Sequence, residues 1–201
     1  MNAGRLIAFE GLDGCGKTTQ VARLVAALRA AGHEVVETRE PTDGSTGRRI
    51  RAMARSGESV SPEQQLAWFF EDRREHVAGL IAPALEKGQI VVTDRYYPST
   101  VAYQGARGLD PERILTESEA EFPLPDLVLI LEIDAEAALQ RVTQRGAARD
   151  AAFERLDLLE RVAAIFGSLE RPYLERVDAR GDPDAVHAAI LARLRERLDL
   201  P

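Results

Sequence analysis

Cysteine is almost absent from the sequence, and so are long apolar runs. The chain of 201 residues has one cysteine, Cys15, which excludes an internal disulfide and leads us to expect a reducing, cytoplasmic compartment. No apolar stretch approaches the roughly 18 residues that a membrane-spanning helix needs, and the N-terminal residues show no signal-peptide pattern. The sequence therefore predicts a protein without a membrane partner.

Basic residues are fewer than acidic ones. The 26 Lys and Arg residues are outnumbered by 33 Asp and Glu residues, which leaves a formal net charge of −7 at pH 7, and the basic runs are few and short. This balance argues against a nucleic-acid partner, because a polyanion is bound by clustered basic side chains. The length and the 45% hydrophobic content predict a single α/β domain over residues 1–201.

A phosphate-binding loop is the clearest motif. Residues 11–18 match the pattern G-x-x-x-x-G-K-[ST] between a short apolar strand at 6–9 and a predicted helix at 18–31. The glycines let successive N–H groups point at an anion, Lys17 reaches the β and γ phosphates, and Thr18 offers its hydroxyl to Mg²⁺. Cys15 is interpreted either as a small spacer or as an oxidation-sensitive thiol. The motif predicts ATP and Mg²⁺ as cofactors, with ATP held by Gly11, Leu12, Asp13, Gly14, Cys15, Gly16, Lys17, Thr18 and Thr19.

Strands and helices alternate along the chain, which predicts an α/β fold with a five-stranded parallel sheet covered by helices on both faces. The most hydrophobic strand, 127–131, is expected at the centre of the sheet. The predicted strands are residues 6–9, 34–38, 90–93, 127–131 and 173–178. The predicted helices are residues 18–31, 48–56, 62–87 with an interruption or end near Pro83, 99–107, 111–121, 135–144, about 153–169 and 183–198, with loops at 42–47 and 145–152.

Several motifs follow strands directly. In parallel sheets, ligands bind at the carboxyl ends of the strands, so the glycine loop, residues 39–41, Asp94, Arg95 and Asp134 should face one cleft. A phosphoryl-transfer enzyme needs positive charge around the acceptor and a carboxylate near Mg²⁺, and Asp94 and Arg95 supply one of each. The alternative is a structural ion pair at the rim of the sheet. The N-K-x-D element that reads guanine in switch GTPases is absent, which argues against that class.

Five motifs together resemble those of the bacterial thymidylate kinases, P-loop nucleoside monophosphate kinases that convert dTMP and ATP to dTDP and ADP. They are F-E-G-L-D-G at 9–14, T-R-E-P at 38–41, F-F-E-D-R at 69–73, D-R-Y at 94–96 followed by Ser99, and A-Y-Q-G at 102–105. The last two are the most specific, since adenylate and shikimate kinases share the loop and an arginine-bearing lid but not these. The resemblance runs nearly end to end. It implies phosphoryl transfer from ATP to dTMP in dTTP biosynthesis, a short lid at about residues 145–153, and a homodimer formed by the helices around residues 65–77 and 99–107.

The resemblance also implies roles in the thymine pocket. Phe69 would stack on the base, and Arg73, one helical turn further on the same face, would hydrogen-bond to its O4 edge. The alternative for this pair is a core phenylalanine and a solvated arginine. Thr100 and Gln104 would complete the pocket, and Tyr103 would close the ribose side at C2′.

Charged residues would hold the phosphates and the sugar. Arg95 would clamp the acceptor phosphate, because its charge is permanent and its donors are forked; Arg51 is a weaker candidate for the same phosphate. Asp94 would orient Mg²⁺ through water, and Asp13 would meet the sugar 3′-hydroxyl unless it only caps the glycine turn. The predicted catalytic residues are Lys17, Asp94, Arg95 and Arg149, the metal-binding residues are Thr18 and Asp94, and the dTMP-binding residues are Asp13, Glu40, Arg51, Phe69, Arg73, Arg95, Thr100, Tyr103 and Gln104.

The lid is expected to carry the catalytic arginine. Some members of this family carry that arginine in the phosphate loop, and others carry it in the lid. Gly14 occupies the position where members of the first kind have a basic residue. Arg145, Arg149 and Arg155 surround the predicted polar loop, and Arg149 is our first choice. The chain departs from the family in two places, since residues 42–46 read T-D-G-S-T where many bacterial members have a Gly-Gly-Thr run, and the lid lacks a dense basic cluster.

Two other functions stay open at this point. A deoxynucleoside kinase would phosphorylate a 5′-hydroxyl and would need a general base, for which Glu40 could serve. Arg95 and Arg51 instead suit the dianion of a monophosphate. A non-catalytic ATP-binding regulatory protein would bind ATP without acceptor-dependent release of ADP.

Overall fold

A five-stranded parallel sheet forms the centre of the computed structural model, which describes residues 4–56, 59–144 and 152–200. The strand order is β2-β3-β1-β4-β5, and every neighbouring pair is parallel. The strands are β1 (Arg5–Gly11), β2 (Val35–Arg39), β3 (Ile90–Asp94), β4 (Leu127–Glu132) and β5 (Leu174–Asp178). The predicted fold class is confirmed, with strand bounds within two residues of those expected.

The middle strand of the sheet is β1, so the expectation that residues 127–131 lie at the centre is wrong. The apolar residues of both β1 and β4 are almost completely shielded from solvent. A continuous apolar run therefore reports burial on both faces of the sheet. It carries no information about the order in which buried strands pair.

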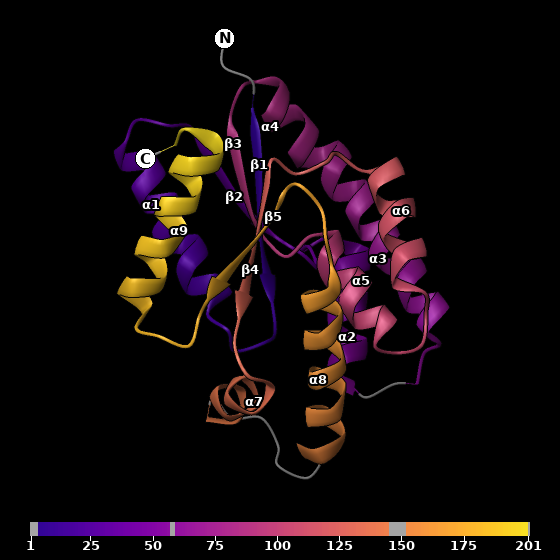
Figure 1. Ribbon diagram of the computed structural model, residues 1–201. Coiled ribbons are helices and arrows are strands. Elements are labelled where there is room, and N and C mark those ends of the chain that lie inside the picture. Colours follow the sequence, from indigo (N-terminus) through magenta and orange to yellow (C-terminus); the bar gives the residue numbers. More distant parts are fainter. Residues whose placement is uncertain (1–3, 57–58, 145–151, 201) are drawn as a thin grey trace.

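Helices cover both faces of the sheet, as Figure 1 shows. On one side lie α1 (Lys17–Ala30) and α9 (Pro183–Leu198), and on the other lie α3 (Pro62–His76), α5 (Tyr97–Gly105), α6 (Pro111–Glu121) and α8 (Ala152–Ser168). The helix α7 (Ala135–Gln144) follows β4 at its carboxyl end (Figure 1). None of the described helices is both long and apolar enough to cross a membrane.

Helix starts are well marked where Asp precedes Pro. The side chain of Asp110 accepts hydrogen bonds from the N–H groups of Glu112 and Arg113, and Asp182 accepts one from Asp184. A proline in the first turn loses no hydrogen bond, because the first N–H groups of a helix have no partner within it. These local signals explain why α6 and α9 have the predicted bounds.

Two helical regions differ in detail from the prediction. The expected interruption near Pro83 is a π-helical turn, η1 (Val77–Ile81), between α3 and α4 (Ala82–Glu86). The helix α2 (Ser45–Ser56) begins three residues before the expected start at 48. The chain packs so tightly there that a Cβ at Gly47 would lie 2.0 Å from the carbonyl oxygen of Thr42, and glycine permits this approach.

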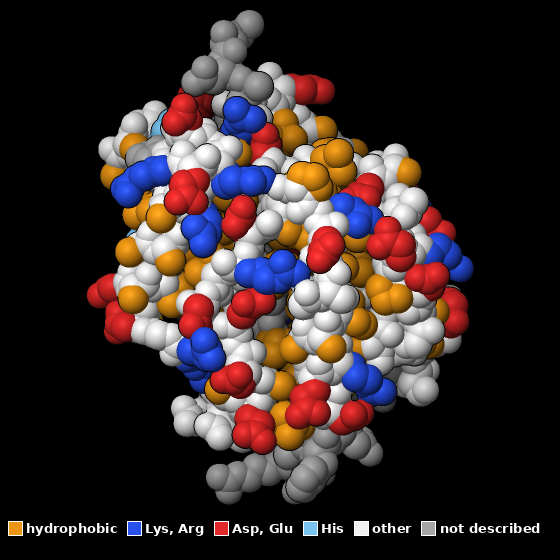
Figure 2. Space-filling view, viewed as in Figure 1, with side chains coloured by type: hydrophobic (Ala, Val, Ile, Leu, Met, Phe, Trp, Pro, Cys, Tyr) orange, Lys and Arg blue, Asp and Glu red, His pale blue; other side chains and the backbone are white. Residues whose placement is uncertain are grey.

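Charges of both signs are interspersed on the surface. On the face in Figure 2, Lys and Arg side chains alternate with Asp and Glu, and the described residues form no broad basic patch there. This agrees with the acidic balance of the sequence.

Candidate active site

The phosphate loop joins β1 to α1 at the carboxyl edge of the sheet. Gly11, Gly14 and Gly16 have φ angles of 129°, 89° and 104°, a region that residues with a Cβ rarely adopt. A Cβ at Gly14 would also lie 2.6 Å from the carbonyl oxygen of Ala138 in α7. The glycine that stands where some thymidylate kinases have a basic residue is therefore required by this backbone.

The side chain of Lys17 contacts the backbone of the phosphate loop. Its Nζ donates hydrogen bonds to the carbonyl oxygens of Gly11, at 3.1 Å, and Leu12, at 2.8 Å. The Sγ atom of Cys15 is 3.7 Å from the same nitrogen. Cys15 is buried, which favours its interpretation as a spacer over that of an oxidation-sensitive thiol.

The two predicted metal-binding residues lie together. The hydroxyl of Thr18 donates to Oδ2 of Asp94 at 2.7 Å, although 76 residues separate them. A hydroxyl beside a carboxylate fits Mg²⁺, which prefers oxygen ligands and is usually held by one or two protein groups together with substrate phosphates. These residues could thus hold a magnesium ion at the phosphate loop.

Two neighbouring pockets meet at Asp13 and Arg95. The first has a volume of about 420 Å³ and is lined by the phosphate loop, including Lys17 and Thr19, and by Asp94. The second has a volume of about 500 Å³ and is lined by Arg51, Phe69, Ser99, Thr100, Tyr103 and Gln104, among others. Both include Asp13 and Arg95. Groups bound in the two pockets would approach each other at this pair.

Arg95 is tied in place at this junction. Its Nη2 donates to Oδ1 of Asp13 at 2.6 Å, and its Nη1 donates to the hydroxyl of Ser99 at 2.6 Å and to the carbonyl oxygen of Gly11 at 3.3 Å. The guanidinium lies 5.2 Å from the ring centre of Tyr103. The predicted acceptor residues Asp13, Arg95 and Tyr103 thus share one corner of the second pocket.

Arg73 is buried behind that pocket, with 1% of its surface exposed. Its Nε and Nη2 donate to Oε2 of Glu40 at 3.0 and 2.6 Å, and Nη2 also donates to the hydroxyl of Thr100 at 3.0 Å. Its Nη1 is buried without a hydrogen-bond partner among the described residues. The alternative of a solvated arginine is therefore wrong, and Phe69, on the same helix, lines the pocket wall.

Glu40 acts as the partner of Arg73. Burial alone would raise the pKa of Glu40, but Arg73 and His76 together hold that pKa below its usual value. Oε1 of Glu40 lies 3.0 Å from Nδ1 of His76, and Nε2 of His76 lies 2.7 Å from the hydroxyl of Thr38. Because the carboxylate can only accept, Nδ1 of His76 carries the hydrogen of the first contact. Sequence reasoning missed His76, although its position three residues after Arg73 on α3 was a usable signal.

Gln104 also leaves a polar atom unsatisfied. The amide of Gln65 donates to the carbonyl oxygen of Val60 at 2.9 Å, so its Oε1 faces Gln104 and accepts from Nε2 of Gln104 at 3.5 Å. Oε1 of Gln104 is consequently buried without a partner among the described residues. Buried polar atoms are nearly always paired. The described residues leave other buried polar atoms without a partner as well, on Gln20 and Tyr97 for example, but Arg73 and Gln104 combine an unpaired donor and an unpaired acceptor at the second pocket.

The remaining predicted residues have varied outcomes. Arg51 lines the second pocket but is engaged with the carbonyl oxygen of Pro41 and with Asp43 at 2.6 and 2.7 Å. Arg145, Arg149 and the side chain of Arg155 lie outside the described residues. Another arginine of this region, Arg141 in α7, donates to the carbonyl oxygen of Gly14 at 3.4 Å, and sequence reasoning had not singled it out.

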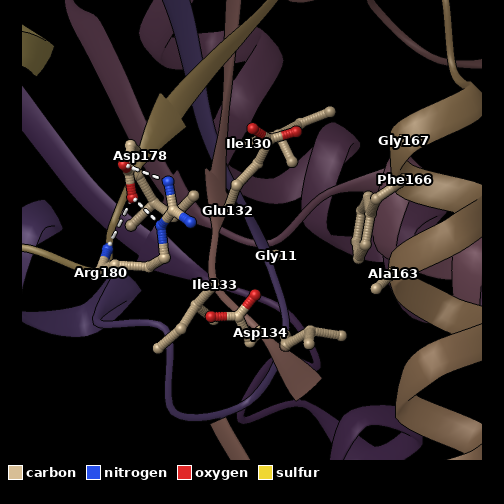
Figure 3. Close-up of a pocket in the computed structure, with 12 residues that line it drawn as sticks. Gly11, Ile130, Glu132, Ile133, Asp134, Ala163, Phe166, Gly167, Asp178 and Arg180 are labelled. Carbon is tan, nitrogen blue, oxygen red and sulfur yellow. Dashed lines mark hydrogen bonds and ion pairs between the residues drawn. The ribbon is translucent and has the colours of Figure 1, made fainter. Parts of the chain in front are cut away.

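Asp134 is not among the residues that line these two pockets, but it shares a third pocket with Gly11 and Leu12 of the phosphate loop. This third pocket has a volume of about 300 Å³ and lies at the carboxyl ends of β4 and β5, next to the phosphate loop. Figure 3 shows the ion pair of Arg180 and Asp178 on one side of this pocket and Phe166 of α8 on the other. The strand β4 pairs with β1 on the side away from β3, and its end therefore lies beyond the phosphate loop.

Comparisons with known proteins agree with the geometry. The family model described as thymidylate kinase matches residues 9–190. A thymidylate kinase of Desulfotalea psychrophila is 42% identical over 199 residues, which cover 99% of this chain and 98% of the relative. Thymidylate kinases of Xanthomonas oryzae pv. oryzae and Xanthomonas campestris pv. campestris are 47% and 45% identical over 97% of this chain and 86% of the relative. The chain therefore belongs to the thymidylate kinase family.

Proposed function

We propose that the protein transfers the γ-phosphoryl group of ATP to dTMP, giving ADP and dTDP. The observation that carries the choice of base is a pair of unsatisfied atoms at the second pocket, the Nη1 donor of Arg73, which is buried behind the pocket, and the Oε1 acceptor of Gln104, which lines it. Thymine offers O4 as an acceptor and N3–H as a donor, which complements this pair. Cytosine offers an amino donor and an N3 acceptor at the same positions, so it would leave both protein groups opposed by their own kind.

The first pocket suits the phosphates of ATP. Loop N–H groups and Lys17 would hold the β and γ phosphates, and Thr18 and Asp94 would hold Mg²⁺. When bound, the ion neutralises part of the charge on the transferred phosphoryl group. A phosphate oxygen of dTMP attacks the γ-phosphorus, the bond from that phosphorus to the β–γ bridging oxygen breaks, and ADP leaves. Arg95, at the junction of the two pockets, would hold the acceptor phosphate in line with this attack.

The environment of Glu40 argues against a deoxynucleoside kinase. Such an enzyme needs a base near the 5′-hydroxyl, and an effective base has a pKa close to the working pH. Both carboxylate oxygens of Glu40 are engaged by Arg73 and His76, and its pKa is lowered. Glu40 is better suited to orient Arg73 than to accept a proton.

The homodimer and the cytoplasmic location stay predictions. Of the two helical regions proposed for the dimer, α5 is buried along most of its length within the subunit itself, from Tyr97 to Ala102. The region around residues 65–77 in α3 is therefore the better candidate for an interface. Sedimentation velocity at several protein concentrations would measure the oligomeric state.

A coupled ADP-release assay tests the function. The protein is supplied with ATP, Mg²⁺ and, in separate reactions, dTMP, dUMP, dCMP, UMP or thymidine, with Lys17→Ala as the inactive control. We expect dTMP to give the highest kcat/KM. Preference for thymidine would support a nucleoside kinase, and ADP release that no acceptor stimulates would support the regulatory alternative.

A further inference from the structure

Glu10 is a fully buried carboxyl group that the reaction described above does not use. It lies on β1 immediately before the phosphate loop, and none of its surface is exposed. Its Oε1 accepts hydrogen bonds from the backbone N–H groups of Tyr96, at 2.8 Å, and Ser99, at 3.2 Å, and its Oε2 accepts one from the hydroxyl of Ser99. All three hydrogen bonds thus go to the N-cap residue and the first turn of α5.

The carboxylate of Glu10 caps α5 from a neighbouring strand. Tyr96 is the N-cap residue of α5, and no side chain of its own segment caps the helix. The N–H groups of Tyr96 and Ser99 belong to the helix start, where a capping side chain usually supplies the acceptor. Because α5 carries Thr100, Tyr103 and Gln104, Glu10 also holds one wall of the second pocket.

Glu10 also holds Arg95 from two sides. Arg95 has a φ of 77°, a left-handed conformation that residues other than glycine adopt only when their surroundings impose it. The peptide that follows Arg95 is fixed by the bond from Tyr96 to Glu10. The guanidinium of Arg95 donates to the hydroxyl of Ser99 at 2.6 Å, and that hydroxyl donates in turn to Glu10. Because the hydroxyl hydrogen of Ser99 points to the negatively charged Glu10, the lone pairs of the Ser99 oxygen face the guanidinium of Arg95.

We propose that Glu10 is a positioning residue for the acceptor phosphate. Through Ser99 it orients the guanidinium of Arg95, and through the start of α5 it keeps the acceptor pocket in place. The proposal rests on the proposed function, because that function makes Arg95 the clamp on the monophosphate. Glu10 itself touches neither substrate.

The test compares the KM values of the two substrates in Glu10→Gln and Ser99→Ala at pH 8, which is above the Glu10 pKa of about 7, so that Glu10 of the wild type is ionised. Glutamine has nearly the same size and still offers one oxygen to the N–H groups, but its nitrogen cannot accept the Ser99 hydrogen. Ser99→Ala removes the connection to Arg95. Hydrogen bonds to charged groups have effects that correspond to roughly 10- to 100-fold in an equilibrium constant. We expect each variant to raise the KM for dTMP by about that factor and to change the KM for ATP by less than about threefold.

The double variant separates positioning from a general structural role. If Glu10 acts through Ser99, the KM for dTMP of the double variant should be no higher than that of the single variant with the larger effect, since the two changes break one connection. Two matched controls lie away from both pockets. Glu119→Gln alters a carboxylate that accepts from Arg171 and Tyr173, and Ser118→Ala removes a hydroxyl that donates to Ile114. Both controls should keep both KM values within about threefold of the wild type.

The outcomes are distinct. If the wild type turns over dTMP but Glu10→Gln raises both KM values equally, or if the effects of the single variants add, the positioning role is overturned while the proposed function stands. If the wild type does not turn over dTMP, the proposed function fails and the proposal fails with it. Should Glu10→Gln not fold, the contrast between Ser99→Ala and Ser118→Ala decides in the same way.

Discussion

Replacing Glu10 by glutamine should change how the stability of the protein depends on pH. Burial raises the pKa of Glu10 from 4.5 to about 7, although Arg95, the hydrogen bonds from Ser99 and Tyr96, and Lys17 all lower it. In the unfolded chain the carboxyl returns to its ordinary pKa. Between pH 4.5 and pH 7 the native state keeps a proton that the unfolded state has lost, so the wild type loses stability as the pH rises.

The size of this loss follows from the two pKa values. A tenfold change in proton affinity corresponds to about 1.4 kcal/mol, so the full loss is about 3 kcal/mol, and most of it falls between pH 5 and pH 8. Glutamine does not titrate, and the variant escapes the loss. The difference in the free energy of unfolding between variant and wild type should therefore move by roughly 2 to 3 kcal/mol in favour of the variant over this range.

Urea unfolding of both proteins without substrates, at pH 5 and at pH 8, measures this difference. The other titrating groups are common to the two proteins, and their contributions cancel in the comparison. A difference that stays constant with pH, or that moves in favour of the wild type at pH 8, would refute the reasoning. A variant that is more stable at pH 8 and still binds dTMP more weakly would separate the positioning role of Glu10 from its effect on the fold.

Three further predictions concern catalysis and specificity. Lys17→Ala should lower kcat by roughly 100-fold or more, because it removes a preorganised charge at the β and γ phosphates; a variant that keeps more than about a tenth of the wild-type kcat would contradict the phosphate-loop assignment. Arg149→Ala should lower kcat far more than it raises the KM for dTMP, as expected for a contact made mainly in the transition state; unchanged kcat with a large loss in Arg145→Ala would move the role to Arg145. In competition assays dUMP, which lacks one methyl group, should trail dTMP by about 10- to 200-fold in kcat/KM, with dCMP and UMP far behind and the penalty for UMP reduced in Tyr103→Phe. Comparable values for dCMP and dTMP would refute the thymine pocket.

Local signals in the sequence determined most of the secondary structure. Asp110 and Asp182, each followed by a proline, mark the starts of α6 and α9 because capping and the fixed φ of proline act within a few residues. The glycines and Lys17 identify the phosphate loop for the same reason. The pair Phe69 and Arg73 was predictable as one face of a helix, since residues four apart in a helix are neighbours.

Only the tertiary structure decided which distant residues meet. The contact between Glu10 and Ser99 spans 89 positions of the sequence, and that between Glu40 and Arg73 spans 33. Such pairs depend on which strands lie side by side, and this order is set by how helices pack over the sheet rather than by the composition of any strand. For the same reason β1 is the middle strand, and Asp134 shares a pocket with Gly11 and Leu12 of the phosphate loop but not with Asp94 and Arg95. The sequence determined the chemical groups of the site, and packing between distant segments determined which of them act together.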